Sequence, residues 1–326
     1  MQKITLGKDL KINRLGLGSW AIGGPWYEGD TPLGWGQVDD GESIRAIHAA
    51  LDLGVDYIDT ANIYGAGLSE DVVGRAIRGR RDRVVVSTKF GILCDPETKR
   101  TTGNMTSIAD MRSSVEDSLK RLQTDYIDLL LFHLGSYPLE QAEEVREELE
   151  KLVHEGKIRY YGWSTELTEC AEVFAKGEHC AAFMHIENLF EDYPEMLSLC
   201  EEHQMISICR SPLCMGLLTG KYNQNSTFAK DDLRGKNAPA WMNYFIDGKP
   251  NAEMMRRLDS VRDILTSEGR TLAQGCLAWL WARNPMTVPV PGFRTIRQAE
   301  DNARAMEKGP LSAEAMRRIR EILKER

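Results

Sequence analysis

The stretch Ile127–His133, which reads IDLLLFH, is apolar nearly throughout, and an amphipathic segment at Leu139–His154 follows it. An apolar run of this length is typical of a strand that is buried on both faces of a parallel sheet. In the segment that follows, apolar residues spaced three and four apart indicate a helix with one buried face. The two segments together predict a strand–helix unit of an α/β protein.

The same pattern recurs along the whole chain. The other strand-like runs are Arg14–Ser19, Tyr57–Thr60, Val84–Lys89, Ile158–Ser164, Ala181–Ile186, Ile206–Ser211 and Thr287–Val290. The other helix-like segments are Ser43–Leu53, Leu68–Ile77, Ile108–Leu122, Thr168–Ala175, Tyr193–His203, Ala273–Arg283 and Ile296–Ala305. Eight strands that alternate with eight helices favour a (β/α)8 TIM barrel. An open, doubly wound sheet is the alternative, but the turn at Leu15–Trp20 lacks the third glycine and the helix start of a dinucleotide-binding turn.

The chain has 326 residues, a length that allows either two domains of average size or one large barrel. The count of strand–helix units favours a single domain over residues 1–326. The extra length lies in two extended loops, Ile22–Asp40 after strand 1 and Asn223–Pro250 between strands 7 and 8. Both would leave the rim of the barrel where catalysis occurs, so we expect them to contribute to substrate selection. A surface loop without such a role is the alternative for Asn223–Pro250.

The composition disfavours several classes of protein. The 41 Lys and Arg against 49 Asp and Glu give a net charge of −8, which argues against nucleic-acid binding. No stretch approaches the ~18 apolar residues of a membrane span, and the first residues lack the apolar core of a secretory signal. The seven cysteines form no CxxC pair, which indicates reduced, buried thiols. We therefore expect a cytoplasmic protein that binds neither nucleic acid nor membrane, and the oligomeric state stays open.

Four polar side chains lie at the carboxyl ends of predicted neighbouring strands, where barrel enzymes place catalysis. Asp59 and Tyr64 follow strand 2, whereas Lys89 and His133 end strands 3 and 4. Each could be structural by itself: Asp59 as a turn cap, Lys89 as the partner of some carboxylate, His133 as a core histidine. Together they predict proton transfer at a carbonyl. An ammonium at Lys89, held by Asp59, would lower the pKa of the Tyr64 phenol. His133 would donate to the substrate oxygen, and a hydride from a cofactor would be the nucleophile.

The segment Gly54–Gly65, which reads GVDYIDTANIYG, resembles the signature of the aldo-keto reductase family. Further matches are Leu15–Gly18, Ser87–Lys89, Leu130–His133, Ser211–Leu213, Gly216–Lys221 and Val290–Asn302, so the resemblance covers nearly the whole chain. It implies a (β/α)8 barrel without a metal that uses NADP(H) rather than NAD(H). It also implies that Tyr64 is the general acid of carbonyl reduction, with Lys89 and Asp59 as its tuning pair. His133 would be the orienting donor.

The resemblance further implies which residues hold the dinucleotide. Arg294 and Gln298 match positions at the adenosine end, with the Arg294 guanidinium on a 2′-phosphate at the start of a helix. Asp301 and Asn302 match an acid and an amide at the adenine. The other expected cofactor contacts are Trp20, Ser164, Thr165, Arg210, Ser211, Leu213, Gly216, Leu217 and Gly292, of which Leu213, Gly216 and Leu217 would line the pyrophosphate.

Three positions depart from the family pattern. Thr165 stands where many members have Asn, and Met184 stands where they have Gln, with Glu187-Asn188 in place of Tyr-Asn. These two changes remove hydrogen bonds to the nicotinamide carboxamide. Arg210 replaces a tyrosine that stacks on the nicotinamide; a flat guanidinium can also stack, or reach a substrate anion.

The sequence therefore predicts an NADP(H)-dependent oxidoreductase that interconverts a carbonyl and an alcohol. Trp26, Trp35 and Trp241, with Arg210, are expected to face the substrate, which indicates an aldehyde, a ketone or a sugar-like molecule that is polar or anionic. The alternative is a cofactor-sensing regulatory subunit with the same barrel, like the potassium-channel β subunits. A metal-dependent isomerase or lyase is disfavoured, because the six histidines form no HxxxH or HExxH pattern.

Overall fold

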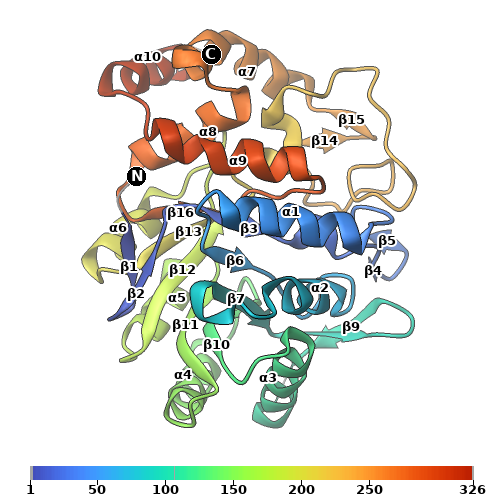
Figure 1. Ribbon diagram of the computed structural model, residues 1–326, viewed down its shortest axis with the longest axis vertical. Coiled ribbons are helices and arrows are strands. Elements are labelled where there is room, and N and C mark those ends of the chain that lie inside the picture. The colour runs from blue at the N-terminus through green and yellow to red at the C-terminus, as the bar shows by residue number, and fades with distance from the viewer. Residues whose placement is uncertain (1–2, 106, 325–326) are drawn as a thin grey trace.

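The computed structural model describes residues 3–105 and 107–324, and its centre is a barrel of eight parallel strands (Figure 1). The strands are β3 (Gly16–Gly18), β6 (Tyr57–Asp59), β7 (Val85–Phe90), β10 (Ile127–Phe132), β11 (Ile158–Ser164), β12 (Cys180–Ile186), β13 (Ile206–Arg210) and β16 (Thr287–Pro289). Each pairs with the next in chain order. The Gly18 amide donates to the Pro291 carbonyl at 3.0 Å and joins the first strand to the last. This closure confirms the predicted barrel and excludes the open doubly wound sheet.

Eight helices occupy the predicted segments on the outside of the barrel. They are α1 (Asp40–Asp52), α2 (Leu68–Ile77), α3 (Ile108–Leu122), α4 (Leu139–His154), α5 (Thr168–Ala175), α6 (Pro194–Glu202), α8 (Leu272–Arg283) and α9 (Ile296–Lys308). In Figure 1, α9 lies beside α1, where the Ile296 amide donates to Glu42 Oε1 at 3.0 Å. The last helix of the barrel therefore packs against the first. Within the described residues, no helix is long and apolar enough to cross a membrane.

Two helices lie outside the repeating units that the sequence analysis identified. Helix α7 (Ala252–Leu265) lies in the interval between β13 and β16, and α10 (Ala313–Lys324) follows α9. Both present buried apolar residues on one side, such as Leu258, Val261 and Ile319. They pack against each other and against α8 (Figure 1). The long interval between β13 and β16 therefore contains helices as well as the extended loop.

Both extended loops are ordered by pairing. The loop after β3 forms the hairpin β4 (Tyr27–Glu28) and β5 (Thr31–Pro32), which joins a second hairpin, β8 (Ile92–Asp95) and β9 (Arg100–Asn104), in a small sheet. The β8–β9 hairpin is a feature that the sequence pattern does not predict. The loop after β13 carries the short hairpin β14 (Phe245–Ile246) and β15 (Lys249–Pro250). It also contacts the loop after β3, because the Leu233 amide donates to the Gly34 carbonyl at 2.9 Å.

Strand alternation decides which side chains enter the barrel, because residues two apart on a strand point to the same face. On β6 these are Tyr57 and Asp59, and on β7 they are Ser87 and Lys89, where Asp59 lies opposite Ser87. The lower part of the interior is apolar, with Leu129 among its buried residues. The hairpin β1 (Ile4–Leu6) and β2 (Leu10–Ile12) covers that end, with Leu6 and Ile12 in the same cluster. Polar side chains are thus concentrated at the opposite, carboxyl end.

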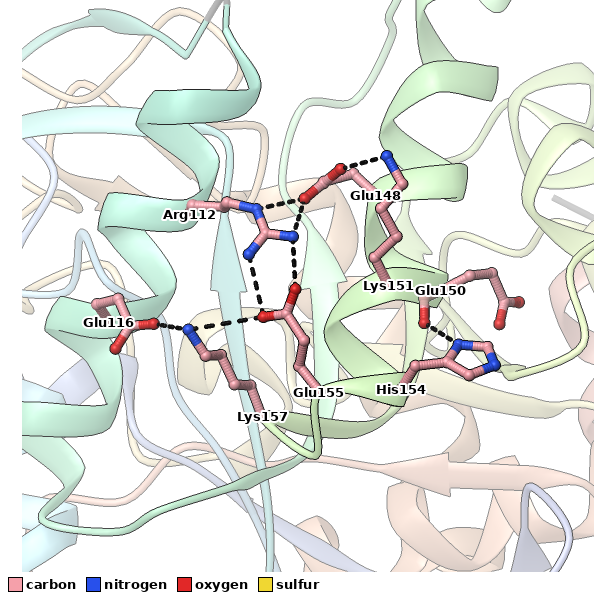
Figure 2. Close-up of polar contacts among 8 residues, drawn as sticks. All are labelled: Arg112, Glu116, Glu148, Glu150, Lys151, His154, Glu155 and Lys157. Atoms are coloured by element: carbon pink, nitrogen blue, oxygen red, sulfur yellow. Dashed lines mark hydrogen bonds and ion pairs between the residues drawn. The ribbon is translucent and has the colours of Figure 1, made fainter.

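An ion-pair network joins α3 to α4 on the outside of the barrel (Figure 2). Arg112 donates to both oxygens of Glu155, at 3.0 and 2.8 Å, and also to Glu148. Lys151 pairs with Glu148 at 3.0 Å, and Lys157 lies between Glu116 and Glu155. The Glu148 side chain is only 5% exposed, so its charge depends on these cations.

Replacing Arg112 with Met should lower the free energy of unfolding by about 2 kcal/mol, because it leaves the buried Glu148 carboxylate with one partner fewer. Urea unfolding followed by circular dichroism measures the change. Lys120→Met on the same helix is the matched control, since Lys120 is 74% exposed and pairs with exposed Asp117. It should stay within about 0.5 kcal/mol of the parent protein. If the two variants lose the same unfolding free energy, the Arg112 network stabilises the fold no more than the exposed Lys120–Asp117 pair does.

Candidate active site

The four predicted catalytic side chains lie together at the carboxyl end of the barrel. Asp59 and Lys89 point inward from the ends of β6 and β7, and Tyr64 is on the loop that follows β6. His133 directly follows β10, and its amide donates to the Phe90 carbonyl at 2.7 Å. The Tyr64 and His133 rings meet edge to face with centroids 6.2 Å apart. The sequence prediction that these residues share one site is thus consistent with their placement.

The Lys89 ammonium has a hydrogen-bond acceptor for each of its three protons. It donates to Asp59 Oδ2 at 2.6 Å, to the Thr60 carbonyl at 2.7 Å and to Tyr64 Oη at 3.4 Å. An ammonium can only donate, so the phenol oxygen of Tyr64 must be an acceptor in this pair. The phenol proton is then directed elsewhere and is available to a third group.

The buried charges determine the protonation of this cluster. Burial lowers the pKa of Lys89, but the attraction of Asp59 and Tyr64 outweighs it, and the pKa of Lys89 is raised above its ordinary value. Burial raises the pKa of Tyr64, and Lys89 offsets only part of that effect. Lys89 therefore acts in the expected direction, but burial outweighs it, and the pKa of Tyr64 lies above that of a free phenol and not below it as expected. Tyr64 is a neutral phenol near pH 7, which is the form that donates a proton.

His133 is a neutral imidazole. Burial, together with the nearby cations Lys89 and Arg210, holds the pKa of His133 well below its ordinary value. Its Nδ1 atom is buried and has no hydrogen-bond partner among the described residues. A buried polar atom of this kind is costly unless a ligand or water satisfies it. A neutral imidazole can still donate one hydrogen bond to a substrate oxygen.

Aromatic rings form one side of the site. Trp20 stacks on Tyr64 with centroids 5.8 Å apart and meets Trp35 edge-on at 5.9 Å. Trp241, from the loop after β13, lies 6.3 Å from Trp20 and is 52% exposed. Trp26 is buried and belongs to an apolar cluster with Tyr64. Trp20, Trp35 and Trp241 therefore form an aromatic wall, and the buried Trp26 packs with Tyr64 and Trp20 in one apolar cluster.

Arg210, the last residue of β13, forms an ion pair with Glu166 that is not evident from the sequence. Its Nη2 atom donates to Glu166 Oε1 at 2.7 Å, and the same oxygen accepts the Ile186 amide at 2.9 Å. Glu166 lies two residues after the end of β11, and this position at a strand end was the signal that could have identified it. Because Glu166 compensates the guanidinium, Arg210 is not the free cation on which the prediction of an anionic substrate depended.

The residues expected at the nicotinamide have other partners in the structure. Ser164 is the buried last residue of β11, and the Thr165 hydroxyl donates to the Gly135 carbonyl at 2.6 Å. Met184 is fully buried among the apolar residues of the barrel interior. Asn188 holds the following turn, since its Oδ1 accepts the Phe190 amide at 2.9 Å.

The segment expected at the pyrophosphate has an unusual backbone. Ser211, Cys214, Met215 and Gly216 have φ of 53°, 48°, 52° and 93°, all in the left-handed region. Left-handed backbone turns are found in loops that bind anions. Within this segment the amides of Cys214 and Gly216 donate to the carbonyls of Ser211 and Leu213, so these two N–H groups are used in the turns themselves. Leu213 and Leu217 are buried beneath this segment. The buried side chain of Arg234 holds it from outside, because Nη1 donates to the Met215 carbonyl at 3.4 Å while Asp232 binds the guanidinium at 2.9 and 2.7 Å.

The residues expected at the adenosine end lie in the turn before α9 and on the helix itself. Gly292 is exposed, and Asn302 donates to its carbonyl at 3.3 Å. The Arg294 guanidinium donates to the carbonyls of Trp35 and Gln37 at 2.7 and 2.5 Å, and Gln298 accepts the Arg294 amide at 2.8 Å.

Asp301 is directed at α8 in this structure. Its carboxylate accepts from the Thr271 hydroxyl and from the Gln274 amide, each at 3.0 Å. These contacts tie α8 to α9 and occupy the carboxylate that was expected at the adenine. The α9 N-terminus, the half-buried Arg294 and the left-handed segment after β13 still lie at neighbouring strand ends, and their chemistry fits an anionic dinucleotide.

No group of three metal-ligating side chains occurs in residues 3–105 and 107–324. The fold and the site define a parallel α/β barrel whose carboxyl end combines a phenol, an ammonium, a carboxylate and an imidazole. This is a set for proton transfer.

Comparison with known proteins identifies the family. The model of the aldo/keto reductase family matches residues 14–324, and the chain belongs to that family, whose members are oxidoreductases. The aldo-keto reductase YhdN of Bacillus subtilis is 39% identical over 229 residues, which span 69% of this chain and 66% of the relative. A glycerol dehydrogenase from Gluconobacter oxydans has a TM-score of 0.82 and 32% identity, covering 99% of this chain and 95% of the other. An aldo/keto reductase from Klebsiella pneumoniae in complex with NADP and acetate has a TM-score of 0.71 and 28% identity, with 99% and 95% coverage.

Proposed function

We propose that the protein is an NADPH-dependent carbonyl reductase in which Tyr64 transfers the proton. The observation that carries this proposal is the triple hydrogen bond of Lys89 to Asp59, Thr60 and Tyr64. Because Tyr64 accepts from Lys89, its phenol proton is free to be donated to a substrate. The Lys89 ammonium is then a fixed positive charge beside the Tyr64 oxygen. Both features suit a general acid.

The roles of the four residues follow from their geometry. NADPH, when bound, supplies the hydride that reduces the carbonyl carbon. Tyr64 gives its proton to the developing alkoxide, and the Lys89 ammonium stabilises the phenolate that remains. Asp59 holds Lys89 in its charged form. His133, neutral and within the same site, donates to the substrate oxygen and orients it.

The cofactor site would extend from β13 to α9. We infer that the left-handed segment at Ser211–Gly216 holds the pyrophosphate, with Leu213 and Leu217 beneath it. Arg294 and Gln298, at the start of α9, would hold the adenosine and its 2′-phosphate. The Klebsiella pneumoniae relative, whose structure contains NADP, supports NADP(H) as the cofactor.

The substrate side favours a neutral carbonyl compound with an apolar or ring face. Trp20, Trp35 and Trp241 supply flat apolar surface, and Arg210 is compensated by Glu166. Fluorescence titration with NADPH and NADH, followed by turnover with a panel of aldehydes and keto-sugars, tests the whole proposal. We expect NADPH to bind more tightly than NADH and to be oxidised by aldehydes. Binding without turnover across the panel would instead favour a cofactor-sensing protein.

Replacing Glu166 with Gln should make the site select anionic substrates. The change exposes the positive charge of Arg210, so kcat/KM for 4-carboxybenzaldehyde should rise about fivefold relative to its neutral methyl ester. Added salt should reduce the gain. Glu28→Gln, on exposed β4 at the same rim, should leave the ratio unchanged. An unchanged ratio in Glu166→Gln would mean that Arg210 does not face the substrate.

A further inference from the structure

A buried hydroxyl chain lies behind the catalytic cluster and has no part in the roles assigned above. Ser87 Oγ donates to Asp59 Oδ1 at 2.7 Å, and Tyr57 Oη lies 2.8 Å from Ser87 Oγ. Both residues are completely buried inside the barrel. The chain therefore reaches Asp59 on the oxygen that Lys89 does not use.

The direction of each hydrogen bond in this chain is fixed by chemistry. An ionised carboxylate only accepts hydrogen bonds, so the Ser87 hydroxyl must donate its one hydrogen bond to Asp59. Ser87 Oγ can then only accept from Tyr57, and the Tyr57 phenol must be the donor. Burial and the negative charge of Asp59 keep the pKa of Tyr57 well above its ordinary value, so this phenol remains protonated. The order of donation is thus Tyr57 to Ser87 to Asp59.

We propose that Ser87 and Tyr57 are positioning residues that fix the rotamer of Asp59, so that Oδ2 faces Lys89 while Oδ1 is held from below. This inference rests on the proposed function of the same site. Strand pairing explains why the pair can do so: Ser87 lies opposite Asp59 across the β6–β7 pair, and Tyr57 lies two residues before Asp59 on the same inward face. Without Ser87 the buried carboxylate would keep a single side-chain partner and could rotate away from the direction that Lys89 requires.

The same hydrogen bond should keep Asp59 ionised. Burial raises the pKa of Asp59, and Lys89 and Ser87 lower it only in part, so the pKa stays above its ordinary value. The titratable groups that interact with Asp59 are Lys89 from β7, Tyr57 from β6 and Tyr64 from the loop after β6. Among these groups, Lys89 is the one cation. If the Ser87 donor is removed, Lys89 alone is left to stabilise the ionised form of Asp59. Protonated Asp59 would cease to hold Lys89 beside Tyr64.

The pH dependence of kcat tests the proposal. In Ser87→Ala the acid limb of the profile should move to higher pH by about one unit with KM unchanged. The plateau of kcat at high pH should stay below that of the parent protein, because the ionised Asp59 is no longer held toward Lys89. Tyr57→Phe should move the limb in the same direction by less, because Ser87 still donates to Asp59. Tyr160→Phe is the matched control: this phenol lies in the same apolar cluster but bonds to Asp9 and Lys8. It should leave the acid limb in place.

A second measurement does not depend on activity. A 13C NMR titration of the Asp59 carboxyl in the cofactor-free protein, assigned with Asp59→Asn, should show the same upward shift in Ser87→Ala. An unshifted carboxyl and an unshifted acid limb in a folded Ser87→Ala variant would overturn the proposal. Failure of the parent protein to reduce carbonyls would overturn the proposed function instead, and the NMR titration would still decide the role of Ser87.

Discussion

Replacing Tyr64 with Phe is expected to lower kcat for aldehyde reduction by about three orders of magnitude. The substitution removes only the phenol oxygen, and with it the proton that the alkoxide needs and the acceptor that Lys89 faces at 3.4 Å. General acid catalysis contributes typically 100-fold to 10,000-fold. Neither neighbour replaces this donor, because His133 is neutral with its pKa well below the ordinary value, and the pKa of Lys89 is raised, so its ammonium gives up a proton poorly. Stopped-flow single-turnover kinetics measures the chemical step directly.

The affinity for NADPH should change less than about twofold in Tyr64→Phe, because the ring and its stack on Trp20 remain. This separates loss of chemistry from loss of binding. Tyr27→Phe on β4 serves as the control for a phenol at the same rim. It should retain the activity of the parent protein. A Tyr64→Phe variant with kcat within tenfold of the parent would rule out Tyr64 as the proton donor.

Replacing Lys89 with Met should abolish turnover and also destabilise the fold. Lys89 and Asp59 are only 1% and 5% exposed, so the substitution leaves an uncompensated carboxylate inside the barrel. Breaking a buried ion pair in this way costs about 3–5 kcal/mol of unfolding free energy. Chemical denaturation at pH 7 gives the loss, and NADPH oxidation in the presence of an aldehyde gives the activity.

Adding Asp59→Asn to Lys89→Met should restore most of the stability and none of the activity. The double variant removes the buried charge, but Tyr64 still lacks the ammonium that stabilises its phenolate. Lys120→Met, on the exposed face of α3, controls for the loss of a lysine elsewhere. If the double variant is as unstable as Lys89→Met, the destabilisation comes from lost packing and not from the unpaired charge.

The residues at strand ends were predictable from the sequence because strand alternation and parallel register leave few alternatives. A run such as Val84–Lys89 fixes the face of every residue on it, and Lys89 must then enter the barrel beside Asp59. The barrel itself followed from the eightfold repeat. The boundaries of α2, α3, α4 and α5 agree with the predicted segments to the residue.

Features that depend on burial and on loop pairing were not predictable. The sign of the pKa shift of Tyr64 depends on how deeply the ring is buried, and the sequence shows only its neighbours. The partner of Arg210 lies 44 residues earlier in the chain, so no local pattern links it to Glu166. The β8–β9 hairpin pairs with the loop after β3, and the few strand residues there carry no clear alternation. Long-range contacts of this kind need the three-dimensional fold.

The central claim is that a hydride passes from the nicotinamide to a carbonyl carbon while Tyr64 supplies the proton. The most direct measurement uses NADPH that carries deuterium at both positions of nicotinamide C4, with an aldehyde substrate and mass spectrometry of the alcohol product. We expect the parent protein to give alcohol with one deuterium on the carbinol carbon, and Tyr64→Phe to give almost none in the same time. Alcohol without deuterium, or equal labelled product from both proteins, would contradict the account.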